Sequence, residues 1–350
     1  MKRIEVLLVD DSATSRMLLQ SMLESDPELL VIASARDGLE AVACVRHRQP
    51  DVIIMDITMP RMDGYEATQQ ILQLYPIPII ICSGAWKSPE AVQSFRAIEV
   101  GAVTAIAKPE GPDSPNYAAT AASIARLVKA MAGVKVVRRL RRGMNGANAI
   151  ETGEQRLPDR VDLLAMGAST GGPPVLKEIF TTMKQLPTFP IVVVQHIAPG
   201  FLDGMVSWLQ AVVPWTIRVA EQGETLLPGH IYFAPDQSHI GLREQRVILD
   251  QQTPAEYGLR PTVDYLFQSM ARHYGSRAVG ILLTGMGSDG ARGLLQMRNS
   301  GALTVAQDQK SSLIFGMPGE AVHSGAAQKV LNPPQIADLL DRLSMQSNRR

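Results

Sequence analysis

The first third of the chain alternates between short apolar runs and segments in which apolar residues recur at helical spacing. The apolar runs are typical of buried strands, and they cover residues 4–9, 29–33, 52–55, 77–82 and 103–107. Helices are expected after the first of these runs and over residues 39–46 and 118–132. Strands that alternate with helices in this way predict a parallel, doubly wound α/β sheet with helices on both faces.

The helix after the first run has a recognisable start and a candidate inner face. Either Ser12 or Thr14 can cap its N-terminus, because a side-chain oxygen there accepts from a free backbone N–H. The side chains expected to face the core are Met17, Leu18, Met22 and Leu23.

The alternation stops between Gly133 and Arg160 and then resumes. Loss of apolar periodicity, with arginines followed by Gly and Asn residues, indicates an interdomain linker. The arginine cluster at positions 138, 139, 141 and 142 could contact an acidic partner or a membrane surface, but a solvated tether is the simpler interpretation. Beyond it, strands are expected over residues 161–166, 191–194, 216–219, 231–234, 247–249, 278–283 and 303–306, and helices over 173–183, 202–210, 262–274 and 291–300.

Composition narrows the class of protein. The chain has 350 residues, which suits two domains, and its 34 basic and 34 acidic residues balance to zero net charge. This balance argues against a nucleic-acid binder driven by overall basicity. Two cysteines, Cys44 and Cys82, exclude a disulfide framework and favour a reducing compartment. No apolar stretch is long enough for a membrane span or a signal peptide, so we expect a cytoplasmic protein without membrane insertion.

Polar residues follow four of the strands expected in the first region. They are Asp10, Asp11, Asp56, Ser83 and Lys108. A single Asp at a strand end is usually a cap or turn residue, but five such positions on one sheet edge favour a site, because ligands bind outside the carboxyl ends of parallel strands. Clustered carboxylates need a cation, and hard oxygen ligands suit Mg²⁺. A carboxylate beside Mg²⁺ and a lysine can attack a phosphoryl group.

A serine, a histidine and an aspartate follow strands of the second region. Ser169 lies between a strand and a helix in MGASTGGP, His196 ends a strand in IVVVQHIAPGF, and Asp289 lies in LLTGMGSDGARG. Taken singly, each fits a helix cap or a structural residue. Together on one edge they fit a nucleophile, a general base and an orienting carboxylate. The serine does not lie in a G-x-S-x-G elbow, so an ordinary α/β-hydrolase assignment is not supported.

Two other ligand sites are disfavoured by the sequence. Gly285 to Gly290 matches G-x-G-x-x-G, with Asp308 at the spacing of a ribose-binding carboxylate. Asp289, however, would place a negative charge in the turn that receives a pyrophosphate, and the strand comes late in its domain. The six histidines show no zinc-ligand spacing.

The first region resembles a two-component receiver domain over about residues 1–125. The motifs that carry the likeness are VLLVDDS, DVIIMDITMPRMDG, Ser83 and Lys108-Pro109. The resemblance implies that Asp56 accepts phosphate from a histidine kinase. It also implies that Asp10, Asp11 and Asp56 hold Mg²⁺, that Ser83 contacts the phosphoryl group and that Lys108 pairs with it. Such domains often carry Phe or Tyr three residues before the lysine. Ala105 stands there, which predicts readout without an aromatic switch or weaker coupling.

The second region resembles the catalytic domain of the chemotaxis protein-glutamate methylesterase (CheB) family. The motifs are MGASTGGP, VVQHIAPGF, IYFAPDQSHI, LRPTVDYLF and LLTGMGSDGARG. The resemblance implies that Ser169, His196 and Asp289 are catalytic. It also implies that the backbone N–H of Met286 is an oxyanion donor, with Thr170 positioning His196 or the substrate. The family hydrolyses glutamate methyl esters on chemoreceptor helices, and many members deamidate glutamines, without a cofactor for the esterase reaction.

We therefore expect a flavodoxin-like receiver domain (1–125), a linker (126–158) and a mainly parallel α/β methylesterase domain (159–345). The implied partners are methyl-accepting chemoreceptors as substrate and a chemotaxis histidine kinase as phosphodonor, with no nucleic acid. Phosphorylation at Asp56 is expected to relieve occlusion of the catalytic edge. Two alternatives stay open: a receiver with a non-catalytic binding output, and a deamidase whose natural substrate is glutamine.

Overall fold

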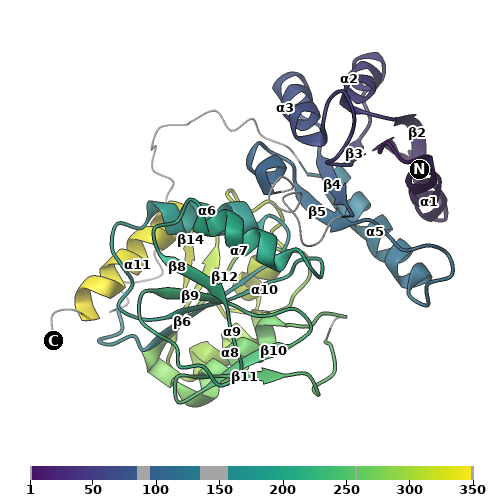
Figure 1. Ribbon diagram of the computed structural model, residues 1–350. Coiled ribbons are helices and arrows are strands. Elements are labelled where there is room, and N and C mark those ends of the chain that lie inside the picture. Colours follow the sequence, from purple (N-terminus) through teal and green to yellow (C-terminus); the bar gives the residue numbers. More distant parts are fainter. Residues whose placement is uncertain (1, 85–94, 135–156, 257, 348–350) are drawn as a thin grey trace. The chain divides into compact units, whose positions relative to one another are not determined.

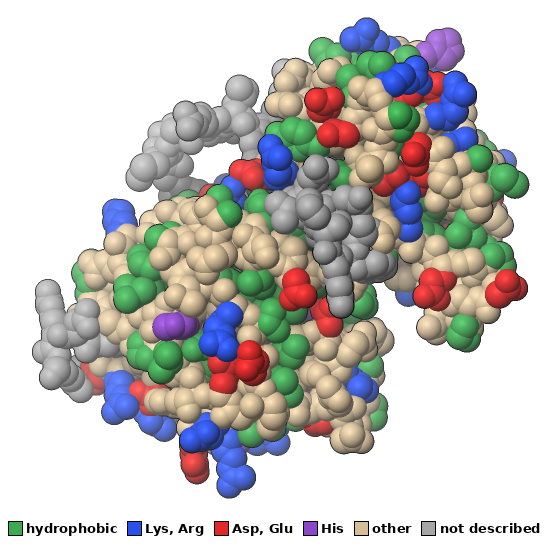
Figure 2. Space-filling model, viewed as in Figure 1, with side chains coloured by type: hydrophobic (Ala, Val, Ile, Leu, Met, Phe, Trp, Pro, Cys, Tyr) green, Lys and Arg blue, Asp and Glu red, His purple; other side chains and the backbone are tan. Residues whose placement is uncertain are grey.

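The computed structural model describes residues 2–84, 95–134, 157–256 and 258–347, and the chain divides into two compact units, Met1–Asn145 and Gly146–Arg350. The arginine cluster at 138–142 lies outside the described residues. Each unit has its own parallel sheet and is described by itself (Figure 1). On the face seen in Figure 2, basic and acidic side chains lie interspersed on both units, in keeping with the balanced charge.

The first unit is a five-stranded parallel sheet with the strand order β2-β1-β3-β4-β5. This is the flavodoxin-like order, and the expected fold class is confirmed. Helices α1 and α5 lie on one face and α2 and α3 on the other (Figure 1). The elements are β1 (Ile4–Val9), α1 (Ala13–Glu24), β2 (Leu29–Ala35), α2 (Gly38–His47), β3 (Val52–Met55), α3 (Gly64–Leu74), β4 (Ile79–Ser83), β5 (Thr104–Ala107) and α5 (Tyr117–Ala132), with a helical segment over residues 95–99.

Helix α1 begins as the sequence indicates and buries two of the four residues expected to face the core, Met22 and Leu23, while Leu18 is half-buried. Ser12 is the cap, since its hydroxyl accepts from the N–H of Ser15 at 3.3 Å. The buried residues are Leu19, Met22 and Leu23, whereas the prediction for Met17 was wrong: it is 72% exposed. Met17 is five positions before Met22, and that spacing places it off the stripe that packs on the sheet.

The last helix of the first unit continues through residues 126–132. It ends at Ala132, packs against α1, and buries Val128 and Met131 within that stretch. The boundary between the two compact units falls at Asn145 and Gly146.

The second unit is a seven-stranded parallel sheet with the order β14-β13-β12-β6-β7-β9-β8. Helices α6, α7 and α11 lie on one face, and α8 and α9 on the other with an antiparallel β10–β11 hairpin (Figure 1). The elements are β6 (Leu163–Ala168), α6 (Gly172–Thr182), β7 (Ile191–Gln195), α7 (Leu202–Gln210), β8 (Thr216–Val219), β9 (His230–Phe233), β10 (His239–Arg243), β11 (Arg246–Asp250), α8 (Val263–His273), η1 (Gly275–Arg277), β12 (Ala278–Leu282), α9 (Ala291–Asn299), β13 (Leu303–Gln307), α10 (Met317–His323), β14 (Lys329–Leu331) and α11 (Pro333–Ser347).

The topology of this sheet determines which loops meet. The chain leaves β6 toward β7 on one side and later returns to place β12 on the other side of β6. The loops after β6, β7 and β12 therefore share one edge at the point where the strand order reverses, which is where doubly wound sheets bind ligands. Within the described ranges, no helix is both long enough and apolar enough to cross a bilayer.

Candidate functional sites

Ser169, the first residue after β6, is fixed through its backbone to both neighbouring strands. Its N–H donates to the carbonyl of Thr284 at 3.0 Å, on the β12 side. On the β7 side, the N–H of His196 donates to the carbonyl of Ala168 at 2.8 Å. Adjacent strands of a sheet lie ~4.8 Å apart, so these bonds place Ser169 and His196 next to each other at the carboxyl edge.

His196 and Asp289 are in direct contact and are largely shielded from solvent. Nε2 of His196 lies 2.9 Å from Oδ2 of Asp289, although the N–H is not aligned on that oxygen as a hydrogen bond. Their side chains are 7% and 3% exposed. Within the described residues the hydroxyl of Ser169 makes no hydrogen bond. In substrate-free enzymes such bonds are often long or misaligned and tighten in the substrate complex.

The Asp289 carboxylate is held by the N-terminus of α8. It accepts from the N–H of Val263 at 2.7 Å and from that of Asp264 at 3.0 Å. The first N–H groups of a helix have no partner within the helix and carry its positive dipole end. These two bonds fix the direction of the carboxylate that contacts His196.

The loop after β12 passes directly beside Ser169. A Cβ at Gly285 would lie 2.7 Å from that of Ser169, so only glycine permits this approach. In the described part of the chain, the N–H of Met286 donates to no backbone carbonyl, and its side chain is 44% exposed. Thr170 is half-buried, and its carbonyl accepts from Thr284 Oγ1 at 3.0 Å.

Sequence reasoning missed two buried amide side chains behind this edge. Gln195 donates to the carbonyls of Ser169 and His196, and Gln307 accepts from the N–H of Thr284 at 2.8 Å. Both residues end buried, mainly apolar strands, IVVVQ and LTVAQ. A glutamine at the end of such a run is the signal that could have found them.

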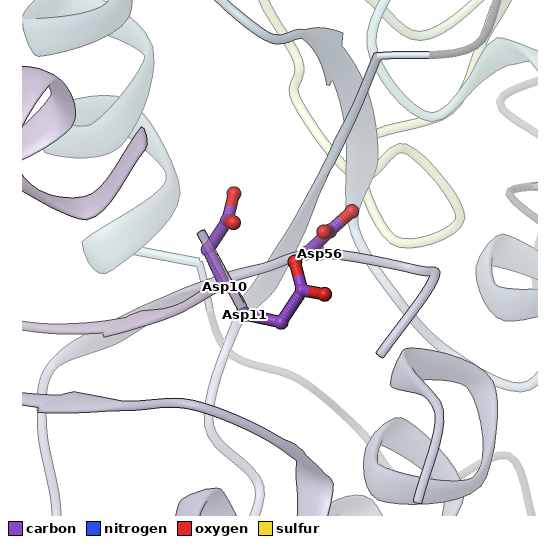
Figure 3. A group of neighbouring side chains, drawn as sticks. All are labelled: Asp10, Asp11 and Asp56. Atoms are coloured by element: carbon purple, nitrogen blue, oxygen red, sulfur yellow. The ribbon is translucent and has the colours of Figure 1, made fainter. Parts of the chain in front are cut away.

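Three carboxylates and a lysine of the first unit lie together where β1, β3 and β5 end. One carboxylate oxygen from each of Asp10, Asp11 and Asp56 lies within 4.8 Å of the others (Figure 3). Nζ of Lys108 lies 2.8 Å from Oδ2 of Asp10 and 2.7 Å from Oδ2 of Asp56. Asp10 and Asp56 are buried whereas Asp11 is exposed, so the cluster opens to solvent on one side.

Burial dominates the electrostatics of Asp56. It raises the pKa of this carboxyl from 3.8 to about 6, against the lowering effect of Lys108 and with a further rise from Asp10. Burial lowers the pKa of Lys108, but the contacts with Asp10 and Asp56 outweigh it and the pKa is raised. The lysine thus stays cationic and neutralises part of the acidic charge. Hard oxygen donors in this arrangement fit Mg²⁺.

The remaining residues of this edge occupy their expected places. Ser83 is buried at the end of β4, and its carbonyl accepts from the N–H of Lys108 at 3.0 Å. Ala105 lies partly buried in β5, paired with Ile81. Gly64 is essential for the local packing, because a Cβ there would lie 1.9 Å from the carbonyl oxygen of Asp56.

These two sites define a class of protein: a response regulator whose output unit is an α/β enzyme domain. Family models agree in both halves, with the response regulator receiver domain matching residues 6–115 and CheB methylesterase matching residues 164–340. The chain belongs to the CheB methylesterase family.

Relatives match almost the full length. The chain is 46% identical over 345 residues to protein-glutamate methylesterase/protein-glutamine glutaminase 4 of Geobacter metallireducens, covering 98% of this chain and 99% of that protein. It is 44% identical to protein-glutamate methylesterase/protein-glutamine glutaminase 1 of Syntrophus aciditrophicus, covering 97% and 98%. The crystal structure of the Thermotoga maritima CheB methylesterase catalytic domain is 34% identical with a TM-score of 0.50, covering 52% of this chain and 98% of that one.

Proposed function

We propose that this protein is a phosphorylation-activated serine esterase that hydrolyses glutamate methyl esters on the cytoplasmic helices of chemoreceptors. The observation that carries the proposal is the 2.9 Å contact between His196 and Asp289 on the sheet edge where Ser169 also lies. The names of the full-length relatives support the choice of substrate. We place the protein in the cytoplasm, where these receptor helices are exposed.

The reaction is an acyl transfer in two halves. Ser169 Oγ attacks the ester carbonyl while the nitrogen of His196 that faces away from Asp289 takes its proton. Met286 N–H stabilises the oxyanion, and His196 returns the proton to the methoxide, which leaves as methanol. Water then attacks the acyl-enzyme with His196 as base, which regenerates Ser169 and leaves a glutamate. Asp289 holds the ring and stabilises the imidazolium, with Thr170 beside the nucleophile positioning His196 or the substrate.

The same site serves deamidation. A glutamine side chain offers the same carbonyl, and ammonia leaves in place of methanol. The names of the relatives include the glutaminase activity, so we propose it as a second reaction of the same three residues. No cofactor enters either reaction.

In the receiver, Asp56 is the phosphoryl acceptor and a chemotaxis histidine kinase the donor. Asp10, Asp11 and Asp56 supply oxygen ligands for Mg²⁺, which lowers the charge on the incoming phosphoryl group when bound. Lys108 pairs with that group and Ser83 donates a hydrogen bond to it. Lys108 contacts both buried carboxylates, at 2.7 and 2.8 Å, and so is positioned to exchange one of them for phosphate.

Methanol release from methylated receptor fragments tests the proposal. Wild type is compared with Ser169→Ala and Asp56→Asn, each with and without a small-molecule phosphodonor and Mg²⁺. Activity should vanish in Ser169→Ala. It should rise with the phosphodonor in wild type and not in Asp56→Asn. Release that persists in Ser169→Ala would refute the nucleophile, and an equal rise in Asp56→Asn would refute the phosphorylation site.

A further inference from the structure

The proposed reaction needs Ser169 and His196 at a fixed separation, and one side-chain amide bonds to the backbones of both. Gln195 is the last residue of β7 and is 6% exposed. Its Nε2 donates to the carbonyl of Ser169 and to the carbonyl of His196, both at 2.8 Å. Both neighbours are acceptors only, so the amide must direct its NH₂ toward them.

This amide acts where the sheet can no longer hold the two segments together. The bond from His196 N–H to Ala168 O lies at the end of the β6–β7 ladder. Beyond it, Ser169 and His196 are the first residues after β6 and β7. The Ser169 carbonyl has one further donor, the N–H of Gly172 at 2.8 Å, from the start of α6. The Gln195 amide thus bonds at once to the segment after β6, at Ser169, and to the segment after β7, at His196.

The surroundings of Gln195 fix the amide in this orientation. Its Oε1 is buried and has no hydrogen-bond partner among the described residues. A Cβ on Gly172 would lie 2.1 Å from that oxygen, so the glycine provides the space the amide occupies. An orphaned buried oxygen is unfavourable, whereas an apolar side chain of this length would leave no such atom. The amide is therefore explained by its two donated bonds rather than by packing.

We infer that Gln195 is a positioning residue that sets the separation and direction of Ser169 relative to His196. The inference rests on the proposed function, in which Ser169 is the nucleophile and His196 the base. A misplacement of ~1 Å between reacting groups can lower a rate about 10²-fold. Gln195 bonds to the backbone carbonyls of Ser169 and His196 rather than to the reacting hydroxyl or ring, so its effect should appear in kcat rather than in KM.

The test compares Gln195→Met with Gln210→Met in the full-length protein. Gln210 also donates to two backbone carbonyls, those of Trp215 and Val213 at 3.0 and 3.4 Å, but it lies at the end of α7. Methanol release should show kcat lowered about 10- to 100-fold in Gln195→Met with KM nearly unchanged. The same parameters should stay within about twofold of wild type in Gln210→Met. Equal kcat values in the two variants, for equal amounts of folded protein, would overturn the inference.

Gln195→Glu provides a second readout that a purely structural role would not produce. A protonated carboxyl can donate one hydrogen bond to either carbonyl, whereas an ionised carboxylate donates none and repels both. The ratio of variant to wild-type kcat should therefore fall as pH rises through the titration of the introduced carboxyl group, and a ratio independent of pH would refute the inference. A wild type that releases no methanol would refute the proposed function and this inference with it, whereas an active wild type with unaffected Gln195 variants would refute the inference alone.

Discussion

Replacing Asp56 by Asn should stabilise the first unit, and by an amount that grows with pH. Asp56 is 4% exposed, and burial raises the pKa of its carboxyl from 3.8 to about 6. The folded state therefore favours the neutral form. Asparagine has nearly the same shape, cannot ionise, and can still accept the bond that Ile57 N–H donates to Asp56 Oδ1 at 2.7 Å.

The magnitude follows from the difference between the two pKa values. A group whose pKa is raised on folding contributes stability that is fully present below the unfolded value and lost as pH rises through the folded value. Here that window runs from 3.8 to about 6. At ~1.36 kcal/mol per pKa unit, ionised Asp56 lowers the free energy of unfolding by about 3 kcal/mol above the window. Because asparagine does not ionise, the Asn variant does not lose this stability as pH rises, and its Lys108 keeps the contact with Asp10.

Native-state hydrogen exchange of the full-length chain measures this difference. The amides of β1 and β3 report on the sheet that carries Asp10 and Asp56, with EDTA present to remove divalent cations. The Asn variant should exceed wild type by up to ~3 kcal/mol at pH 7.5 and by much less at pH 4.5. Asp113→Asn, at an exposed carboxylate of the same unit, is the control and should show little difference at either pH.

A gap between Asp56→Asn and wild type that is the same at both pH values, or smaller at pH 7.5, would refute the reasoning. Mg²⁺ gives a further check. A cation bound by the carboxylates stabilises the folded state and offsets the charge that burial disfavours. Adding Mg²⁺ at pH 7.5 should therefore narrow the gap, by stabilising wild type more than the variant.

Three further predictions concern single side chains. Asp289→Asn keeps the size of the side chain but removes the carboxylate charge beside His196, so kcat for methanol release should fall about 10⁴-fold with far-UV circular dichroism unchanged. An unaltered kcat would exclude an orienting role. Gly64→Ala places a Cβ 1.9 Å from the Asp56 carbonyl oxygen, so the first unit should lose about 2–4 kcal/mol in the same exchange experiment, and unchanged protection would contradict the steric argument. Lys108→Met removes the cation that lowers the pKa of Asp56, so its carboxyl should titrate above about 6 by carbon-detected NMR, and a lower midpoint would show that the lysine does not act in this way.

The sequence by itself determined the layered class of both units and most of their strands. Short apolar runs ending in Asp, Ser, Lys or His specify a strand that is buried along its length and polar only at its carboxyl end. This is why Asp10, Asp56, Ser83 and Lys108 could be assigned to one edge before their contacts were known. The helices α3, α10 and α11 and the strands β10 and β14 were not predicted. Strand β14 has three residues and helix α10 has seven, which is too short for a clear apolar pattern. Helix α11 begins after Asn332, which forms reciprocal cap bonds with Gln335.

Only the tertiary structure decided which residues of the second unit meet. Ser169, His196 and Asp289 follow three strands that are well separated in the sequence, and they converge because β12 returns to the free side of β6. The bonds from the start of α8 to Asp289 join segments that are distant in the sequence. The bonds from Gln195 to two carbonyls lie beyond the ends of the strands. Apolar periodicity records burial of single segments, whereas strand order and buried polar contacts arise only when segments pack, so no local pattern could specify them.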